Sequence, residues 1–260
     1  MTAPNSQDDA PGTVTIPAHF HGPPESGNGG YTCGLAAVAL GTAPAQVRLR
    51  IPPPLDRPLR MEHRGELKVL LDGDKVVAEV RLADVDMETP SPIGYGAAID
   101  ALGRFDVDAY ASEHAFPTCF TCGPLRGPGE GLRIFPAPVA GRPGLVVSPW
   151  VPDESYADDD GLIRDEIVWA ALDCPSGLVW IFGDPPTGPA VLGQLAVSIV
   201  RRPSPGDELV VAGWRTDADG RKCHSGSAVW TAGGDLIAKG QAIWILLADE
   251  QHSTFNTATR

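Results

Sequence analysis

Two segments of the sequence combine residue types that could activate a carbonyl group, and the first is rich in glycine. It reads SGNGGYTCGLAA (residues 26–37), with Asn28, Gly29 and Gly30 directly before an alanine-rich run that predicts a helix. Glycine permits close approach of a ligand, and the unpaired N–H groups at a helix start favour a negatively charged oxygen. The same residues also suit a structural use, in which Asn28 caps the helix and the glycines let it pack tightly. The sequence leaves both interpretations open.

The second segment, DEIVWAALDC (residues 165–174), places carboxylates on an apolar helix. Asp165 and Glu166 stand at its start, where acidic side chains commonly favour the helix dipole. Asp173 differs because it follows the apolar run WAAL, and an isolated buried carboxylate is costly. It must therefore be paired, hydrogen-bonded or functional. The structural alternative is an acid at the helix end that holds the turn CPSG (residues 174–177).

Cys119 and Cys122 form a CxxC pair, which is half of a zinc site. A structural zinc ion needs four ligands, and the other candidates are scattered single residues: Cys33, Cys174, Cys223, His114 and His224. A thioredoxin-like function would need a helix after the pair, which Gly123–Pro124 prevents. We therefore expect a tight turn with small buried thiols, no stoichiometric zinc and no metal ligands.

An internal repeat indicates which elements must position these segments. Residues 47–59 (VRLRIPPPLDRPL) align without a gap with residues 197–209 (VSIVRRPSPGDEL), and residues 69–80 match residues 229–240 with one extra residue in the second copy. A small-residue apolar run precedes each pair, at residues 29–40 and 166–174. The order helix, strand, turn, strand, hairpin strand therefore occurs twice, which predicts one supersecondary unit used twice, each copy covering the other.

This order resembles the hotdog fold, in which a long antiparallel sheet wraps one central helix, over roughly residues 13–247. The resemblance rests on GPPESGNGGYTCGLAA (22–37), FPTCFTCGPLRGPGEGLRIFP (116–136), WAALDCPSG (169–177) and AVWTAGGDLIAKGQAIWI (228–245). It implies an α+β double hotdog with two antiparallel sheets of about equal strand number, joined edge to edge, each wrapping a central helix. We expect an N-terminal unit over residues 13–113, a connector rich in Pro, Gly and Cys over residues 114–131, and a C-terminal unit over residues 132–247.

Similarity to thioesterases of this fold implies roles for the residues at the first helix start. In those enzymes a glycine pair opens the central helix and polarises the thioester carbonyl, which assigns this role to Gly29, Gly30 and the N–H of Tyr31. Those enzymes often carry a histidine before the glycines, where this chain has Asn28. Asparagine can donate a hydrogen bond but cannot shuttle a proton near neutral pH.

The same similarity implies that Asp173 acts as general base or nucleophile, with Glu166 as the second choice. The first helix has the glycine-rich start and no acid, whereas the second has the acid and no glycine pair. We therefore predict one composite site per chain, at the interface of the two units. Arg201 and Arg202, which precede a turn, are candidates to contact a phosphate of the acyl carrier.

The implied function is metal-free, cofactor-free hydrolysis of an acyl thioester of CoA or of a carrier protein. Two other functions stay open. One is a non-catalytic module that binds acyl-CoA or lipid, which Asn28 in place of histidine suggests. The other is a dehydratase or another small-molecule enzyme on the same fold. Turnover of a panel of acyl-CoAs would separate the enzymes from the binding module.

Composition narrows the partners and the location. The formal net charge is −13, which disfavours nucleic acid and anionic membranes as partners. We expect no membrane association, because no apolar run reaches the length of a membrane span. The polar first residues lack a secretion-signal pattern. The simplest interpretation of the five cysteines is that they are reduced thiols. These features predict a cytoplasmic protein, and homo-oligomers of double-hotdog chains are compatible with them.

Overall fold

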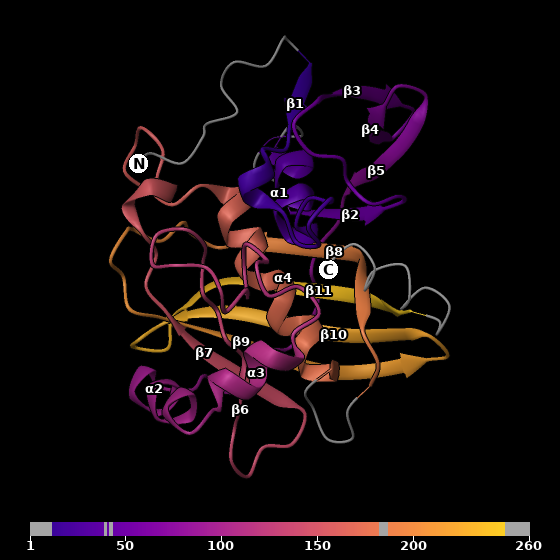
Figure 1. Ribbon diagram of the computed structural model, residues 1–260. Coiled ribbons are helices and arrows are strands. Elements are labelled where there is room, and N and C mark those ends of the chain that lie inside the picture. The colour runs from indigo at the N-terminus through magenta and orange to yellow at the C-terminus, as the bar shows by residue number, and fades with distance from the viewer. Residues whose placement is uncertain (1–11, 39–40, 42–43, 182–186, 248–260) are drawn as a thin grey trace.

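The protein is built on one antiparallel sheet of eleven strands, which a computed structural model describes over residues 12–38, 41, 44–181 and 187–247 (Figure 1). The strand order is β1-β3-β4-β5-β2-β8-β11-β10-β9-β7-β6. The first half of the chain supplies β1 (Thr13–Thr15), β2 (Ala45–Leu49), β3 (Pro58–Arg64), β4 (Leu67–Asp72) and β5 (Lys75–Leu82). The second half supplies β6 (Ala137–Pro138), β7 (Leu145–Trp150), β8 (Ala190–Ile199), β9 (Leu209–Asp219), β10 (Lys222–Thr231) and β11 (Leu236–Leu246).

The predicted repeat is visible in the strand order on either side of the β2–β8 pair. Outward from β2 follow β5, β4, β3 and β1, and outward from β8 follow β11, β10, β9 and β7. The aligned residues Leu59 and Leu209 lie on β3 and β9, the third strands outward on each side. Val69 and Val229 lie on β4 and β10, the second strands outward. The repeated segments therefore occupy equivalent places about the centre of the sheet.

The two sheets expected from the sequence form one continuous sheet in the described residues. The halves join because β2 pairs with β8, from Ala45 opposite Val197 to Arg48 opposite Gln194. This pairing satisfies backbone groups that two separate sheets would leave exposed along an edge strand. The expected edge-to-edge junction is therefore present, and the expectation of two sheets is corrected to two halves of one continuous sheet.

Two central helices lie against the sheet and pack on each other, α1 (Gly29–Val38) and α4 (Asp165–Ile181). The sequence predicts that the second helix ends near Cys174, but α4 continues through Pro175 to Ile181. An interior proline costs about 3 kcal/mol, yet every residue from Glu166 to Trp180 is buried, so packing outweighs that local cost. Asp173 therefore lies inside the helix, and the alternative of an acid at its end is wrong.

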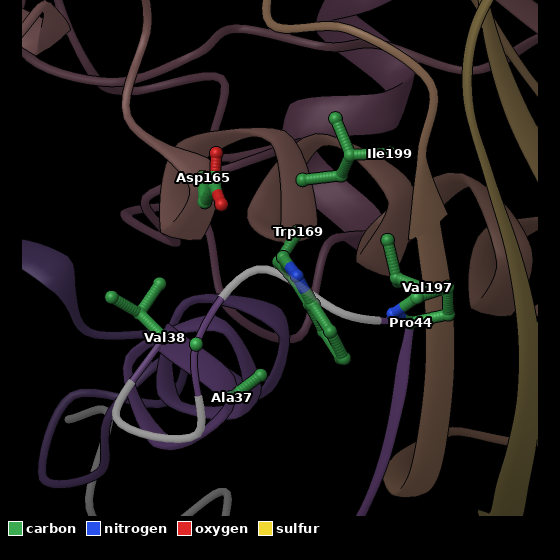
Figure 2. Close-up of a pocket in the computed structure, with 8 residues that line it drawn as sticks. Ala37, Val38, Pro44, Asp165, Trp169, Val197 and Ile199 are labelled. Atoms are coloured by element: carbon green, nitrogen blue, oxygen red, sulfur yellow. The ribbon is translucent and has the colours of Figure 1, made fainter. Parts of the chain in front are cut away.

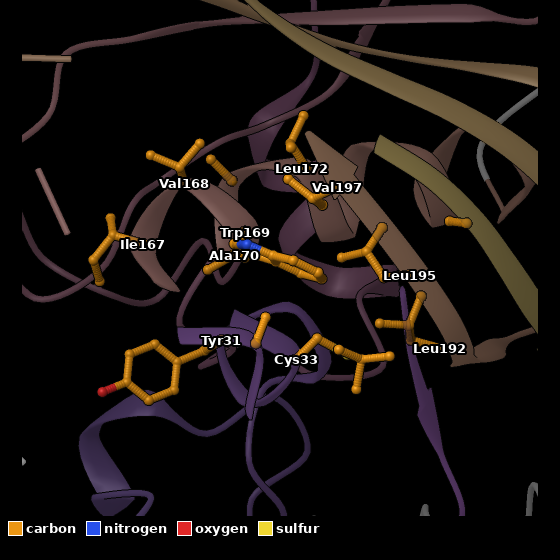
Figure 3. Close-up of a cluster of buried hydrophobic side chains, with 14 of the residues drawn as sticks. Tyr31, Cys33, Ile167, Val168, Trp169, Ala170, Leu172, Leu192, Leu195 and Val197 are labelled. Carbon is orange, nitrogen blue, oxygen red and sulfur yellow. The ribbon is translucent and has the colours of Figure 1, made fainter. Parts of the chain in front are cut away.

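The two helices come close to backbone contact because α1 carries glycine where they touch. A Cβ atom on Gly30 would lie 2.5 Å from the Cβ of Asp173 and 2.7 Å from the carbonyl oxygen of Trp169. A Cβ atom on Gly34 would lie 2.5 Å from the Cα of Glu166. The tight packing expected of the first helix is therefore observed. Figure 3 shows the surrounding core, which the two helices and β8 share: Tyr31, Cys33, Ile167, Val168, Trp169, Ala170, Leu172, Leu192, Leu195 and Val197.

Two further helices, α2 (Tyr95–Gly103) and α3 (Val107–Glu113), follow β5 in the chain. The first of them packs on strands of the second half, where Ala98 and Ala101 are buried with Val147 and Val210. Two short 3-10 turns, η2 (Ala18–Phe20) and η3 (Glu154–Tyr156), complete the elements of the described chain. Residues 114–131 contain no helix or strand, as predicted for the connector, while the division of the chain at residue 114 stays a prediction. None of the helices within the described ranges is long and apolar enough to cross a bilayer.

Candidate active site

A cavity of about 410 Å³ opens where the start of α1 meets the middle of α4. Its polar part comes from three places far apart in the sequence: the start of α1, the irregular segment 114–131, and α4. Its apolar part comes from the last turns of α4 and from the ends of β8 and β11. Its lining residues include Asn28, Gly29, Arg50, His114, Cys119, Cys122, Asp173, Cys174, Leu178, Ile181, Leu192, Trp244 and Ile245.

Asp173 is the buried carboxylate that lines this cavity, with only 2% of its surface exposed, whereas Glu113 lines it from an exposed position. Its Oδ2 accepts a hydrogen bond from the N–H of Gly30 at 2.8 Å. Its Oδ1 is buried and has no hydrogen-bond partner in the described part of the chain. Burial raises the pKa of Asp173 to about 7, although the Gly30 N–H and the side chain of Asn28 oppose the shift. The side chain can therefore take up or release a proton near neutral pH.

Asn28 caps α1 and at the same time lines the cavity. Its Oδ1 accepts a hydrogen bond from the N–H of Tyr31 at 2.9 Å, so the predicted N-cap is present. Its Nδ2 donates to the sulfur of Cys119 at 3.7 Å. Both ends of this amide are therefore engaged, and its position relative to the helix start is set by hydrogen bonds.

The N–H groups at the start of α1 differ in their availability. The Gly30 N–H is bound by Asp173 and the Tyr31 N–H by Asn28, so neither is free for a ligand. The Gly29 N–H makes no hydrogen bond to another described residue, and Gly29 lines the cavity. Of the three donors predicted from the sequence, Gly29 is thus the one placed to meet a carbonyl oxygen. The side chain of Tyr31 stacks on Phe20, with ring centroids 3.9 Å apart, and does not line the cavity.

Glu166, the second choice for the acid, lies about two helical turns from Asp173 and outside the cavity. Its carboxylate pairs with Arg164 at 3.3 Å, and both side chains are almost fully buried. Burial raises the pKa of Glu166, and the charge of Arg164 opposes the shift. The structure therefore brings Asp173, Asn28, Gly29 and Gly30 together and leaves Glu166 apart from them.

The arginines chosen from the sequence lie away from the cavity. Arg202 pairs with Asp158 at 2.5 Å and with Asp160, and its Nε lies 3.9 Å from Asp165 at the start of α4. Arg201 is exposed beside it and does not line the cavity. Arg50 does line the cavity, where it pairs with Glu79 at 2.6 Å. It was one of several isolated basic residues in the sequence, and nothing in its local pattern set it apart.

A second, much smaller depression lies at the other end of the α1–α4 contact (Figure 2). It has a volume of about 20 Å³, which is room for a water molecule and no more. Its lining comes from the end of α1, the start of α4 and β8: Ala37, Val38, Gly41, Pro44, Asp165, Trp169, Val197 and Ile199. Asp165 thus borders a shallow notch rather than a ligand cavity.

The CxxC turn brings its thiols against α4 beside Asp173. The sulfur atoms of Cys119, Cys122 and Cys174 lie within 4.8 Å of one another, and all three residues are buried. Cys119 and Cys174 are 3.8 Å apart, sulfur to sulfur. The turn with buried thiols expected from the sequence is present. Its convergence with Cys174 was not foreseen, because the CxxC pair lies in a proline-rich loop and Cys174 lies within an apolar helix, far along the chain.

Solved structures similar to this one share its fold across nearly the whole chain. The tesB protein MAP1729c of Mycobacterium avium subsp. paratuberculosis has a TM-score of 0.60 at 14% sequence identity, over 91% of this chain and 92% of that one. A putative thioesterase from Novosphingobium aromaticivorans has a TM-score of 0.58 at 14% identity, over 91% and 95%. A protein of unknown function with a hot dog fold, from Alicyclobacillus acidocaldarius, has a TM-score of 0.53 at 13% identity, over 91% and 92%.

Sequence comparison adds no closer relative. No protein-family model matches the chain, and no curated protein matches it. At 13–14% identity the structural likeness establishes the fold alone. What the site does must therefore be argued from its own residues.

Proposed function

We propose that this protein, which has the hotdog fold, hydrolyses an acyl thioester carried by CoA or by a carrier protein. One observation carries the proposal: Asp173 lies in the cavity with one oxygen held by Gly30 and the other without a partner in the described chain. Burying a carboxylate with an unpaired oxygen costs folding free energy, and this cost favours a functional role for Asp173 over a structural one. Its pKa of about 7 suits a group that must accept a proton at neutral pH.

The start of α1 supplies the electrophilic side of the reaction. A thioester carbonyl oxygen placed at the Gly29 N–H would meet a free donor and the positive end of the helix dipole. Asp173 would then take a proton from a water molecule whose oxygen bonds to the carbonyl carbon. The carbon–sulfur bond breaks as the tetrahedral intermediate collapses, and the proton passes to the departing thiolate. Direct attack by the free Oδ1 of Asp173, followed by hydrolysis of the anhydride, uses the same geometry.

The walls of the cavity fit an apolar acyl group. Leu178, Ile181, Leu192 and Trp244 line it, and burying apolar surface contributes roughly 25 cal/mol per Å². Arg50 is a cation on the same lining and could meet a phosphate of the carrier, although Glu79 already neutralises part of its charge. These features support a substrate with an apolar acyl end and an anionic carrier end.

We further infer that the two halves of the sheet are two fused hotdog units that share one composite site. The equivalent strand positions about β2–β8 support this inference. The first unit supplies the helix start with Gly29, and the second supplies Asp173. Two similar solved structures are named as a tesB protein and a putative thioesterase, which agrees with the proposed chemistry.

Thiol release from a panel of acyl-CoAs tests the proposal. We expect saturable release of CoA above the uncatalysed rate, with medium and long acyl groups preferred over acetyl because the cavity is apolar. If no acyl-CoA or acyl-carrier protein releases thiol, hydrolysis is ruled out. Thermal stabilisation by the same acyl-CoAs would then assign the cavity to binding without catalysis, the function that Asn28 in place of histidine also allows.

A further inference from the structure

Three cysteines from two distant parts of the chain converge in a way that the proposed hydrolysis does not require. Cys119 and Cys122 come from the irregular segment 114–131, and Cys174 comes from α4. Their sulfur atoms all lie within 4.8 Å of one another. In a tetrahedral zinc site with zinc–sulfur bonds of about 2.3 Å, neighbouring sulfur atoms are about 3.8 Å apart. The sulfur atoms of Cys119 and Cys174 already lie at this distance, 3.8 Å. The sequence offered only a CxxC pair, from which we expected no zinc. The fold supplies the third thiol and so reopens the question of a metal site.

The CxxC turn is built tightly enough to hold its sulfur atoms in place. The Gly123 N–H donates to the Cys119 carbonyl at 2.8 Å, and a Cβ atom on Gly123 would lie 2.5 Å from the backbone nitrogen and oxygen of Cys119. The hydroxyl of Thr121 donates to the Ala170 carbonyl of α4 at 3.0 Å. The turn is thereby tied to the helix that carries Cys174, so the three sulfur atoms do not depend on a mobile loop.

Two nitrogen donors point at the cluster from outside it. Asn28 Nδ2 donates to the Cys119 sulfur at 3.7 Å, and the Nε2 of His114 lies 3.3 Å from the Cys122 sulfur. The Phe116 N–H donates to the Nδ1 of His114 at 2.9 Å, so the ring proton sits on Nε2 and is directed at Cys122. Such N–H donors to sulfur are the partners that orient metal-bound thiolates. His114 is by this geometry an outer partner rather than a ligand.

We propose that Cys119, Cys122 and Cys174 bind one zinc ion through their thiolates, with the fourth coordination position facing the cavity that all three residues line. Thiolates are soft ligands that select zinc over magnesium or calcium. Binding releases the three thiol protons to solvent as three zinc–sulfur bonds form. The positive charge of the ion offsets the cost of burying the three thiolate charges, which would be large without a counter-charge. The proposal does not depend on thioester hydrolysis.

Metal analysis of the whole protein, purified with reductant and without chelator, tests this site. We expect about one zinc per chain, and at least roughly tenfold less in Cys119→Ser and Cys174→Ser. Cys223→Ser is the matched control, a buried cysteine on β10 outside the cluster, and it should keep its zinc. His114→Ala should also keep it, and loss of zinc from a folded His114→Ala protein would overturn the three-thiolate ligand set.

Cobalt provides a readout that is independent of catalysis and of the variants' folding. Wild-type protein stripped of metal and titrated with Co²⁺ should develop the sulfur-to-cobalt charge-transfer bands of a tetrahedral thiolate site, saturating at about one equivalent. Zinc-free wild-type protein that shows no such bands, with five free thiols on denaturation, overturns the proposal. A disulfide between Cys119 and Cys174 in protein purified under reductant also overturns it.

Discussion

The two ends of the contact between α1 and α4 hold the same backbone arrangement and opposite chemistry. At one end the start of α1 carries Gly29 and Gly30, and the ninth residue of α4 is Asp173. At the other end the start of α4 carries Asp165, and the ninth residue of α1 is Ala37. The first end opens into a cavity of about 410 Å³ and the second into a notch of about 20 Å³. The two ends share a scaffold, and only one of them has the groups that we propose for catalysis.

Side chains explain why the second end is closed. Trp169 and Val197 border the notch, as Figure 2 shows, so a bulky ring occupies space that the open end leaves free. Asp165 places negative charge at the helix start, where it would repel a developing oxyanion instead of stabilising it. Ala37 has no proton-accepting group. This difference supports the proposed composite site, to which each half of the repeat contributes one part.

The strongest way to break this comparison is to remove the carboxylate from the open end. Asp173→Asn keeps the size of the side chain and an oxygen to accept from Gly30, so the fold should persist. We expect thioester hydrolysis to fall by at least about a hundredfold, the effect of losing a general base. Glu166→Gln makes the same change near the closed end and should leave the rate close to wild type. Wild-type rates in Asp173→Asn with an inactive Glu166→Gln would move the base to Glu166.

The close approach of the helices at the open end can be tested with one methyl group. Gly30→Ala places a Cβ atom 2.5 Å from that of Asp173, so it should destabilise the protein by about 1–3 kcal/mol and displace the carboxylate. Gly96→Ala, on the exposed face of α2 with no atom within 4 Å of the added Cβ, should stabilise the protein by about 0.5–1 kcal/mol. Urea unfolding measures both changes. Equal changes in the free energy of unfolding for Gly30→Ala and Gly96→Ala would contradict the close contact between α1 and α4 at Gly30.

Asn28 both caps α1 and lines the cavity, so substitutions at this residue test its effects on stability and on reaction rate separately. Asn28→Ala removes the oxygen that accepts the Tyr31 N–H, so we expect the free energy of unfolding to fall by about 1 kcal/mol. The rate of thioester hydrolysis should fall less than it does in Asp173→Asn. Asn28→Ser keeps a capping oxygen and should recover most of the stability. Unfolding curves and initial rates on the best acyl-CoA check the two effects. An Asn28→Ala protein as stable as wild type would show that the cap contributes nothing.

The smallest expected effect concerns pH and the carboxylate near the closed end. Burial raises the pKa of Glu166 above its usual 4.5, so folding favours the protonated form. Its contribution to stability is fully present below pH 4.5 and is lost as pH rises through the raised pKa. Relative to Glu166→Gln, the wild type should therefore lose stability as the pH rises above about 4.5, measured by urea unfolding. A difference that is constant with pH would show that Glu166 does not titrate in this range.

Local sequence pattern predicted many of the helices and strands, because the spacing of apolar residues along a segment reflects which of its faces is buried. The aligned segments around Leu59 and Leu209 foretold strands in equivalent places, and the turn at Gly73 joins β4 to β5 as a hairpin. An acid within an apolar run marked Asp173, and the glycine-rich start of α1 marked the place it would face. The strands follow from periodicity within each segment, whereas the facing of Asp173 and the glycine-rich helix start was implied by the resemblance to hotdog thioesterases.

Tertiary structure alone decided how the parts combine. Pairing of β2 with β8 makes one sheet of two halves, and burial carries α4 through Pro175. Which N–H stays free at the start of α1 depends on Asp173, more than a hundred residues away, accepting from Gly30 and leaving Gly29 open. The approach of Cys174 to Cys119 likewise depends on how a loop packs on a helix. Such contacts form between side chains distant along the chain, and their energies come from packing and hydrogen bonding that no local pattern encodes.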